Sequence, residues 1–270
     1  MGTHHICSTC GTQFAETAAP PDRCPVCKDE RQYVNWKGQT WTSLAALRQG
    51  HRNVLREEEP GVTSIVTEPS FAIGQRALLL QTASGNILWD CLSLIDEPTV
   101  QAVQALGGLS AIAISHPHYY SSTVEWSRAF DSIPIYLHAA DREWVMRPDP
   151  AIRHWETETH RLGDGVTLIR CGGHFSGAAV LHWGASVGGK GALFTGDTIQ
   201  VVLDRTHVSF MRSYPNLIPL SALAVRRIVD AVQPYAFDRI YGAFTGRTIT
   251  REAKTALLRS ADRYVEALRG

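Results

Sequence analysis

Two histidines, His116 and His118, stand one residue apart directly after the apolar segment Ala111 to Ser115. In an extended backbone, residues i and i+2 project to the same side, so both imidazoles can bind one metal ion. Pro117 biases His116 toward extended backbone, which favours that arrangement. The pair therefore predicts part of a metal site at the end of a buried strand.

Two further candidate ligands follow later in the chain. His174 lies in the segment Gly172 to Gly177, whose glycines permit a tight turn after a strand. Asp197 follows the apolar residues Ala192 to Thr195, again at the expected end of a strand. Three imidazoles and one carboxylate at three strand ends favour a metal ion at the rim of a sheet, and this donor set suits zinc or iron.

The order and spacing of these residues resemble the metallo-β-lactamase superfamily over almost all of residues 60–270. His-x-His is followed about 56 residues later by Gly-His-x-x-Gly, and 23 residues further by Phe-x-Gly-Asp. The resemblance implies an α/β fold, the αββα four-layer sandwich. It implies that His116, His118 and His174 bind the first metal and that Asp197 bridges two metals. Asp90, at the end of an apolar strand, is carried over as a supporting residue.

The sequence departs from that family where the second metal would bind. The family pattern His-x-His-x-Asp-His here ends in Tyr120 and Ser121, and the segment Tyr241 to Phe244 lacks the histidine that the family usually has near the C-terminus. All three private ligands of the second metal are therefore missing. We expect a single catalytic ion, either zinc or iron.

Few residues remain as general acid or base once the usual aspartate is lost. We expect Asp197 to orient the attacking water and Tyr119 or Tyr120 to assist proton transfer, because a cation can lower the pKa of a nearby phenol. His207 and Tyr214 lie in the region after Asp197 that often shapes the substrate pocket, so they are the candidate substrate-binding residues.

Four of the six cysteines form two Cys-x-x-Cys pairs, Cys7 with Cys10 and Cys24 with Cys27. Four thiolates in this spacing can close a tetrahedron around one ion. The segment resembles the rubredoxin-like ribbon of rubrerythrins and also ordinary zinc ribbons. Residues 1–35 are thus expected to form a ribbon around a structural zinc, with a redox iron as the alternative.

The remaining chain divides into a linker and one main domain. Residues 36–60 are expected to be a linker with a short helix between Trp41 and Leu55, and residues 61–270 the metallo-β-lactamase-like domain. Hydrophobic patterning predicts its strands at 62–67, 71–81, 86–90, 111–115, 133–138, 166–170, 179–183, 192–195 and 238–241. It predicts helices at 98–106, 122–130, 221–232 and 250–268, and one that begins at Asp141.

Composition excludes several classes of function. The 270 residues include 26 basic and 26 acidic side chains, and a net charge of zero argues against binding to nucleic acid or an anionic membrane. The apolar runs are too short to cross a bilayer, and the N-terminus lacks the pattern of a signal peptide. We expect a cytoplasmic protein with a small-molecule substrate, and homo-oligomerisation is left open.

Three functions are consistent with these residues. The first is a metallo-hydrolase acting on an ester, thioester or lactone. The second is a mononuclear iron oxidoreductase that resembles persulfide dioxygenases. The third is a degenerate, non-catalytic member of the superfamily whose ribbon engages a partner.

Overall fold

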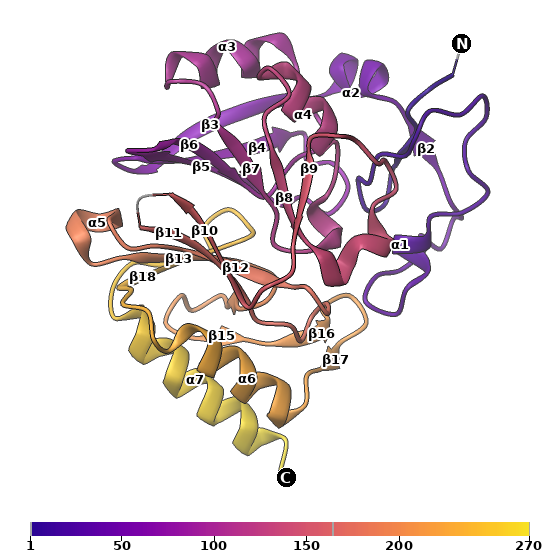
Figure 1. Ribbon diagram of the computed structural model, residues 1–270. Helices are drawn as coiled ribbons and strands as arrows, with labels where there is room; N and C mark the ends of the chain where they lie inside the picture. Colours follow the sequence, from indigo (N-terminus) through magenta and orange to yellow (C-terminus); the bar gives the residue numbers. More distant parts are fainter. Residues whose placement is uncertain (1, 164, 270) are drawn as a thin grey trace.

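Two β-sheets lie face to face at the centre of the molecule, and helices cover both outer faces (Figure 1). The computed structural model describes residues 2–163 and 165–269. This arrangement confirms the predicted αββα four-layer sandwich. Within the described residues, no helix has both the length and the apolar character needed to cross a membrane.

The first sheet has seven strands in the order β3-β4-β5-β6-β7-β8-β9. It is antiparallel from β3 to β6 and parallel from β6 to β9. Its strands are β3 (Arg52–Glu59), β4 (Val62–Glu68), β5 (Ala77–Thr82), β6 (Gly85–Trp89), β7 (Ala111–Ala113), β8 (Ile135–His138) and β9 (Ile152–Trp155).

The second sheet has six strands in the order β10-β11-β12-β13-β18-β19, and only the β13–β18 pair is parallel among those described. Its strands are β10 (Thr159–Gly163), β11 (Val166–Arg170), β12 (Ala179–Trp183), β13 (Ala192–Gly196), β18 (Arg239–Gly242) and β19 (Thr248–Ile249). Three short pairs lie outside the two sheets: β1 (Ile6–Cys7) with β2 (Trp41–Thr42), β14 (Gln200–Val201) with β15 (Val208–Ser209), and β16 (Met211–Ser213) with β17 (Ile218–Pro219).

The longer helices occur near their predicted positions. Ser43, Asp96 and Ser221 cap the N-termini of α2, α3 and α6 through side-chain oxygens. The helices are α1 (Pro25–Lys28), α2 (Leu44–Gly50), α3 (Glu97–Ala105), α4 (Thr123–Ala129), α5 (Ser186–Gly189), α6 (Ala222–Val232) and α7 (Ala253–Ala267). Two 3₁₀ helices are η1 (Pro117–Tyr119) and η2 (Ala139–Trp144).

Alternation along the strands produces three apolar layers. In β5, Leu78 and Leu80 pack between the two sheets, whereas Leu79 packs toward α3 and α4. A third cluster fills the space between the second sheet and helices α6 and α7. One apolar cluster thus lies between each pair of neighbouring layers, and these three clusters hold the four layers together as one sandwich.

The N-terminal segment packs along one side of the sandwich, drawn in indigo in Figure 1. The N–H of Gln13 donates to the carbonyl of Ser121 at 3.1 Å, and the N–H of Ala15 donates to that of Met146 at 3.0 Å. The hydroxyl of Ser93 donates to the carbonyl of Gly11 at 2.8 Å. The segment is therefore joined to loops of the first sheet by hydrogen bonds that involve its own backbone.

The predicted linker, residues 36–60, is more ordered than the charge pattern indicated. Its helix ends at Gly50 instead of Leu55, and Arg52–Glu59 form strand β3, paired along its length with β4. β3 lies at the edge of its sheet, where charged side chains can pair or stay in solvent: Arg56 bonds to Glu68 at 2.8 Å. In the sequence alone, the same charges favour a linker.

Two other predicted elements also differ. The strand predicted to begin at Phe71 begins at Ala77, because residues 69–76 form a loop. The helix predicted from Asp141 is the short 3₁₀ helix η2. Strands β9 and β10, which are short and partly exposed, were not predicted.

Candidate metal centre

His116, His118, His174 and Asp197 come together from three separate loops. His116 follows β7 and precedes η1, His118 lies within η1, His174 follows β11, and Asp197 follows β13. One ligand atom from each of these four residues lies within 4.8 Å of those from the other three. All four side chains are buried.

The closest approaches define which atoms face one another. His118 Nδ1 lies 3.3 Å from His174 Nε2, and His116 Nε2 lies 3.7 Å from Asp197 Oδ2. Three imidazole nitrogens and one carboxylate oxygen therefore lie in the same small volume. The arrangement is that of a ligand set around one ion.

The backbone that brings the first two histidines together is only partly the predicted one. His116 is extended, with φ −168° and ψ 169°, as expected for a residue before proline. His118, however, lies in the 3₁₀ turn closed by the bond from Tyr119 N–H to the carbonyl of His116 at 3.1 Å. Proline fits the first position of such a turn, which the i, i+2 strand argument did not include.

Second contacts fix the orientation of two of the rings. The Nδ1 of His174 lies 3.0 Å from the carbonyl of Met211, which can only accept, so this nitrogen carries the proton and Nε2 is free to bind a cation. Ser115 Oγ lies 2.8 Å from Nδ1 of His116, and Asp90 Oδ1 accepts the N–H of Ser115 at 2.8 Å. Asp90 thus acts on His116 through Ser115.

Burial sets the protonation of the four groups. It lowers the pKa of His174 to about 4 and those of His116 and His118 well below their ordinary value, so the imidazoles are neutral, as metal ligands must be. Burial also raises the pKa of Asp197 to about 7. A cation would reverse this effect and hold the carboxylate ionised.

The residues fit a divalent ion. Nε2 of His116 and Oδ1 of Asp197 are buried and have no hydrogen-bond partner in the described part of the chain. Unpartnered buried acceptors are costly, and coordination would satisfy them. Three neutral imidazoles and one carboxylate are chemically suited to zinc or ferrous iron.

The two tyrosines after the histidines lie in different surroundings. The ring of Tyr119 is 4.4 Å from that of His116, and its hydroxyl interacts with the carboxylate of Asp197 without the geometry of a regular hydrogen bond. Burial and the carboxylates of Asp197 and Asp90 raise the pKa of Tyr119, opposite in sign to the effect of a cation.

Both tyrosines belong to the apolar core on the helix side of the first sheet, but Tyr120 makes no ring contact with the histidines among the described residues. It lines a separate small cavity with Gln13, Leu137 and Met146. The expected participation of Tyr120 in proton transfer therefore lacks geometric support, because successive residues of the turn point to different sides.

A cavity of about 110 Å³ adjoins the centre and is lined by His118, His174 and Asp197. The predicted residue Tyr214 also lines it, and its hydroxyl donates to the carbonyl of Asp197 at 3.1 Å. His207 lies elsewhere: its Nδ1 is 2.8 Å from Asp204 Oδ2 in the turn before β15. The structure thus brings Tyr214 to the pocket and leaves His207 in a surface loop.

Sequence reasoning missed several residues of the same cavity. Arg31 and Gln32, which follow the second cysteine pair, form part of its wall. Ile73 and Phe244 contribute apolar side chains from two further loops. A contact between Arg31 and residues some 150 positions away has no local signal in the sequence.

The four predicted cysteines also converge. Their sulfur atoms lie within 4.8 Å of one another, with Cys7 Sγ 3.5 Å from Cys27 Sγ and Cys10 Sγ 3.6 Å from Cys24 Sγ. A tetrahedral ion with metal–sulfur bonds of about 2.3 Å needs sulfurs about 3.8 Å apart, so only slight expansion is required. The cluster fits a zinc or iron ion.

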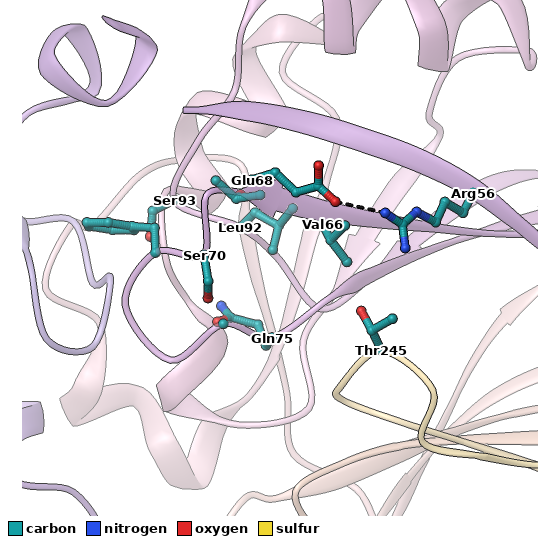
Figure 2. A pocket seen from close by; sticks show the side chains of 11 residues that line it. Arg56, Val66, Glu68, Ser70, Gln75, Leu92, Ser93 and Thr245 are labelled. Atoms are coloured by element: carbon teal, nitrogen blue, oxygen red, sulfur yellow. Dashed lines mark hydrogen bonds and ion pairs between the residues drawn. The ribbon is translucent and has the colours of Figure 1, made fainter. Parts of the chain in front are cut away.

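Another cavity, of about 320 Å³, lies beside the metal pocket (Figure 2). Gly74 and Thr245 line it, whereas their neighbours Ile73 and Phe244 line the metal pocket. Figure 2 shows Arg56 and Glu68, from the adjacent strands β3 and β4, joined by an ion pair. The charged side chains of this cavity are therefore already paired with each other.

Comparisons with known proteins agree with this description. The DIM-1 metallo-β-lactamase structure superposes with a TM-score of 0.61 at 16% identity, covering 80% of this chain and 98% of that one. FIM-1 from Pseudomonas aeruginosa, in its mono-zinc form, gives 0.57 at 15% identity, covering 79% and 96%. No family model matches the chain.

The stacked sheets, their covering helices and the His/Asp cluster define a protein of the metallo-β-lactamase fold. YmaE of Bacillus subtilis (strain 168), described as an uncharacterized protein, is 50% identical over 267 residues, which is 98% of this chain and 97% of YmaE. The chain belongs to the same family as YmaE.

Proposed function

We propose that the protein is a metal-dependent hydrolase with one catalytic ion, bound by His116, His118, His174 and Asp197. The observation that carries this proposal is the convergence of four buried ligand atoms within 4.8 Å at the edge of a cavity. DIM-1 and FIM-1, whose solved structures have the same fold, are metallo-β-lactamases, which supports hydrolysis as the reaction class.

Use of a single ion is supported by what occupies the second-metal positions. Tyr120 packs in the core, and the hydroxyl of Ser121 is already bonded to the Cys91 carbonyl and the Gln75 amide. FIM-1 is known in a mono-zinc form, so the fold itself tolerates one ion.

The substrate that we propose is a small ester, thioester or lactone. The cavity of about 110 Å³ is below the roughly 300 to 1,000 Å³ of pockets that enclose drug-sized ligands. Only a small reacting group therefore fits against the ligands.

A divalent ion at this centre supplies Lewis acidity, which polarises a carbonyl and makes water more acidic. With the ion bound, the Oδ1 of Asp197 would orient the attacking water. The hydroxyl of Tyr119, buried beside His116, would relay the proton that the water loses to the leaving group. Phe175, packed against all three imidazoles, limits the access of bulk water.

We propose that the four-cysteine ion is zinc with a structural role. The cysteine sulfurs are fully buried among Phe14, Val26 and Trp41, which leaves no open coordination position for a substrate.

Metal analysis combined with a substrate panel tests the proposal. Protein purified without added metal is analysed for zinc and iron, and turnover is measured on esters, thioesters and lactones. Two zinc ions per chain and turnover that disappears in His118→Ala are the expected results. Iron with oxygen consumption would favour the oxidoreductase instead, and full metal occupancy without any turnover would favour the non-catalytic alternative.

A further inference from the structure

The segment 29–32 connects the four-cysteine cluster to the metal pocket. It begins directly after α1, which contains Cys27, and the N–H of Asp29 donates to the carbonyl of Pro25 at 3.2 Å. Two residues later, Arg31 and Gln32 line the cavity that adjoins His118. The position of this wall therefore depends on the cysteine knuckle that precedes it.

The same segment is also held from the opposite side. The amide of Asn216 donates to the carbonyls of Glu30 and Gln32, at 2.9 and 2.8 Å. The hydroxyl of Ser213 donates to the carbonyl of Arg31 at 3.2 Å. Met211, whose carbonyl orients His174, lies in the same stretch of chain as Ser213 and Asn216. The same stretch therefore holds both segment 29–32 and the candidate ligand His174.

The guanidinium of Arg31 has a fixed orientation. Its Nε and Nη2 donate to the two carboxylate oxygens of Asp29, at 2.5 and 2.9 Å. Its Cζ lies 3.9 Å from the centre of the Phe175 ring, which in turn is 4.9 Å from the ring of His118. Only 11% of the Arg31 side chain is exposed.

One nitrogen of that guanidinium is left over. Within the described residues, Nη1 of Arg31 makes no hydrogen bond, although the side chain borders the cavity. A guanidinium only donates hydrogen bonds, so Nη1, which is open to solvent, takes its acceptor from water or from a molecule bound in the cavity. Hydrogen bonds between ionised partners are the strongest, which favours an anionic group.

We propose that Arg31 is a substrate-binding residue that selects for a carboxylate on the substrate, through hydrogen bonds donated by Nη1. The substrate class is then a short acyl compound bearing a carboxylate, with its reacting carbonyl at the His/Asp centre. That the bound carboxylate belongs to a substrate rests on the proposed function. The binding of a small carboxylate can, however, be measured without turnover.

A pair of isosteric probes tests it. Mercaptoacetate and mercaptoacetamide each present a thiol to the ion, but only the first has a carboxylate. Dissociation constants are measured by calorimetry on the zinc-loaded full chain. The wild type is expected to bind mercaptoacetate about 10- to 100-fold more tightly than the amide, as for hydrogen bonds to charged groups. Arg31→Met is expected to bring this ratio close to one.

Arg212→Gln is the matched control. Arg212 bonds to Glu30 at 2.6 Å, and its side chain is 40% exposed. The substitution therefore removes a nearby positive charge that lies outside the cavity. We expect the ratio of the two constants to be unchanged. An equal loss of the ratio in both variants would show a general electrostatic effect and overturn the role of Arg31.

The wild type alone already decides part of the question. Equal affinity of the wild type for the two probes would refute the proposal, whether or not Arg31→Met folds. An unchanged ratio of the two constants in folded, metal-loaded Arg31→Met would also refute it. Failure of the zinc-loaded wild type to bind either thiol would show that the ion is not open to a ligand from the cavity, and would refute the proposal. A retained carboxylate preference without turnover on any ester, thioester or lactone would reject the hydrolase and keep Arg31 as a binding residue.

Discussion

The two clusters of metal-binding side chains are built in opposite ways. The four cysteines come from two knuckles within the first 27 residues, and apolar side chains enclose their sulfurs. The three histidines and Asp197 come from loops spread over 82 positions, and three of the four ligands border a cavity. Closed thiolate sites are typical of structural ions, and sites beside a cavity are typical of catalytic ions.

The two clusters also differ in what holds their ligands. Each cysteine is positioned by its own knuckle, whereas His116 depends on a hydrogen bond with the hydroxyl of Ser115, and His174 on the one that its Nδ1 donates to the carbonyl of Met211. The His/Asp centre is thus sensitive to distant parts of the fold. The cysteine cluster, in contrast, is followed in the chain by segment 29–32, whose Arg31 and Gln32 line the cavity beside the centre.

Breaking the cysteine cluster is expected to have the largest effect. Cys27→Ser should lose one metal ion per chain and lower the unfolding temperature by more than about 10 °C, because binding of a structural zinc is worth on the order of 10 kcal/mol in isolated peptides. Metal analysis and thermal unfolding measure both effects. Cys171→Ala, which removes a buried thiol outside the cluster, should keep both ions. Full metal content in Cys27→Ser would refute the structural role.

Removing a histidine ligand should abolish activity and leave the cysteine ion in place. We expect His118→Ala to lose one ion per chain and at least about 100-fold in kcat/KM on whichever substrate the wild type hydrolyses. His207→Ala is the matched control, because this histidine pairs with Asp204 in a surface turn. A comparable loss of activity in His207→Ala would mean that this loop reaches the substrate.

A carboxyl group behind His174 should make stability depend on pH. Burial raises the pKa of Asp141 to about 6, against an ordinary value of 3.8, and its Oδ1 accepts the N–H of Gly177 at 2.8 Å. Because the folded-state pKa is the higher one, the stabilisation is complete below about pH 4 and is lost as pH rises through 6, by roughly 3 kcal/mol. Asp141→Asn keeps the accepting oxygen without titrating.

Urea unfolding of the wild type and Asp141→Asn between pH 4 and pH 7 measures this difference. Relative to the variant, the wild type should become less stable as the pH rises. Parallel pH profiles would show that Asp141 does not titrate in this range.

The smallest expected effect concerns the hydrogen bond to His116. Ser115→Ala removes the hydroxyl that lies 2.8 Å from Nδ1 of His116, and we expect the affinity for the catalytic ion to fall about 10- to 100-fold. Competition with a chelator of known affinity measures it. Ser122→Ala is the control, since Ser122 Oγ is buried without a partner in the described chain. Equal affinities of wild type and Ser115→Ala would show that this contact does not tune the ion.

The sandwich and the meeting of the four candidate ligands could be predicted because the order and spacing of the motifs resemble a known family and the strands show local apolar patterns. Strand alternation such as that of Leu78 to Leu80 is visible in any window, and the spacing of His116, His118, His174 and Asp197 follows a known family. The cysteine spacing is equally local. These features need no knowledge of how distant loops pack.

What the sequence did not predict depends on tertiary contacts. β3 was missed because its charges are compatible with an edge strand only once β4 is beside it. His207 and Tyr214 lie in the same region of the chain, and only folding separates the one in the turn from the one in the pocket. Arg31 was not considered at all, because nothing near it in the sequence concerns the catalytic ion.

The hydrogen bonds from Asn216 to Glu30 and Gln32 have a practical consequence for engineering. A chain shortened to residues 61–270 would lose one side of its own pocket and, together with it, the edge strand that pairs with β4. Grafting residues 1–40 from a relative, in contrast, would replace that side while leaving every histidine of the metal centre untouched. Such a graft would have to keep the partners of the loop that contains Asn216, since these contacts set where the exchanged wall stands.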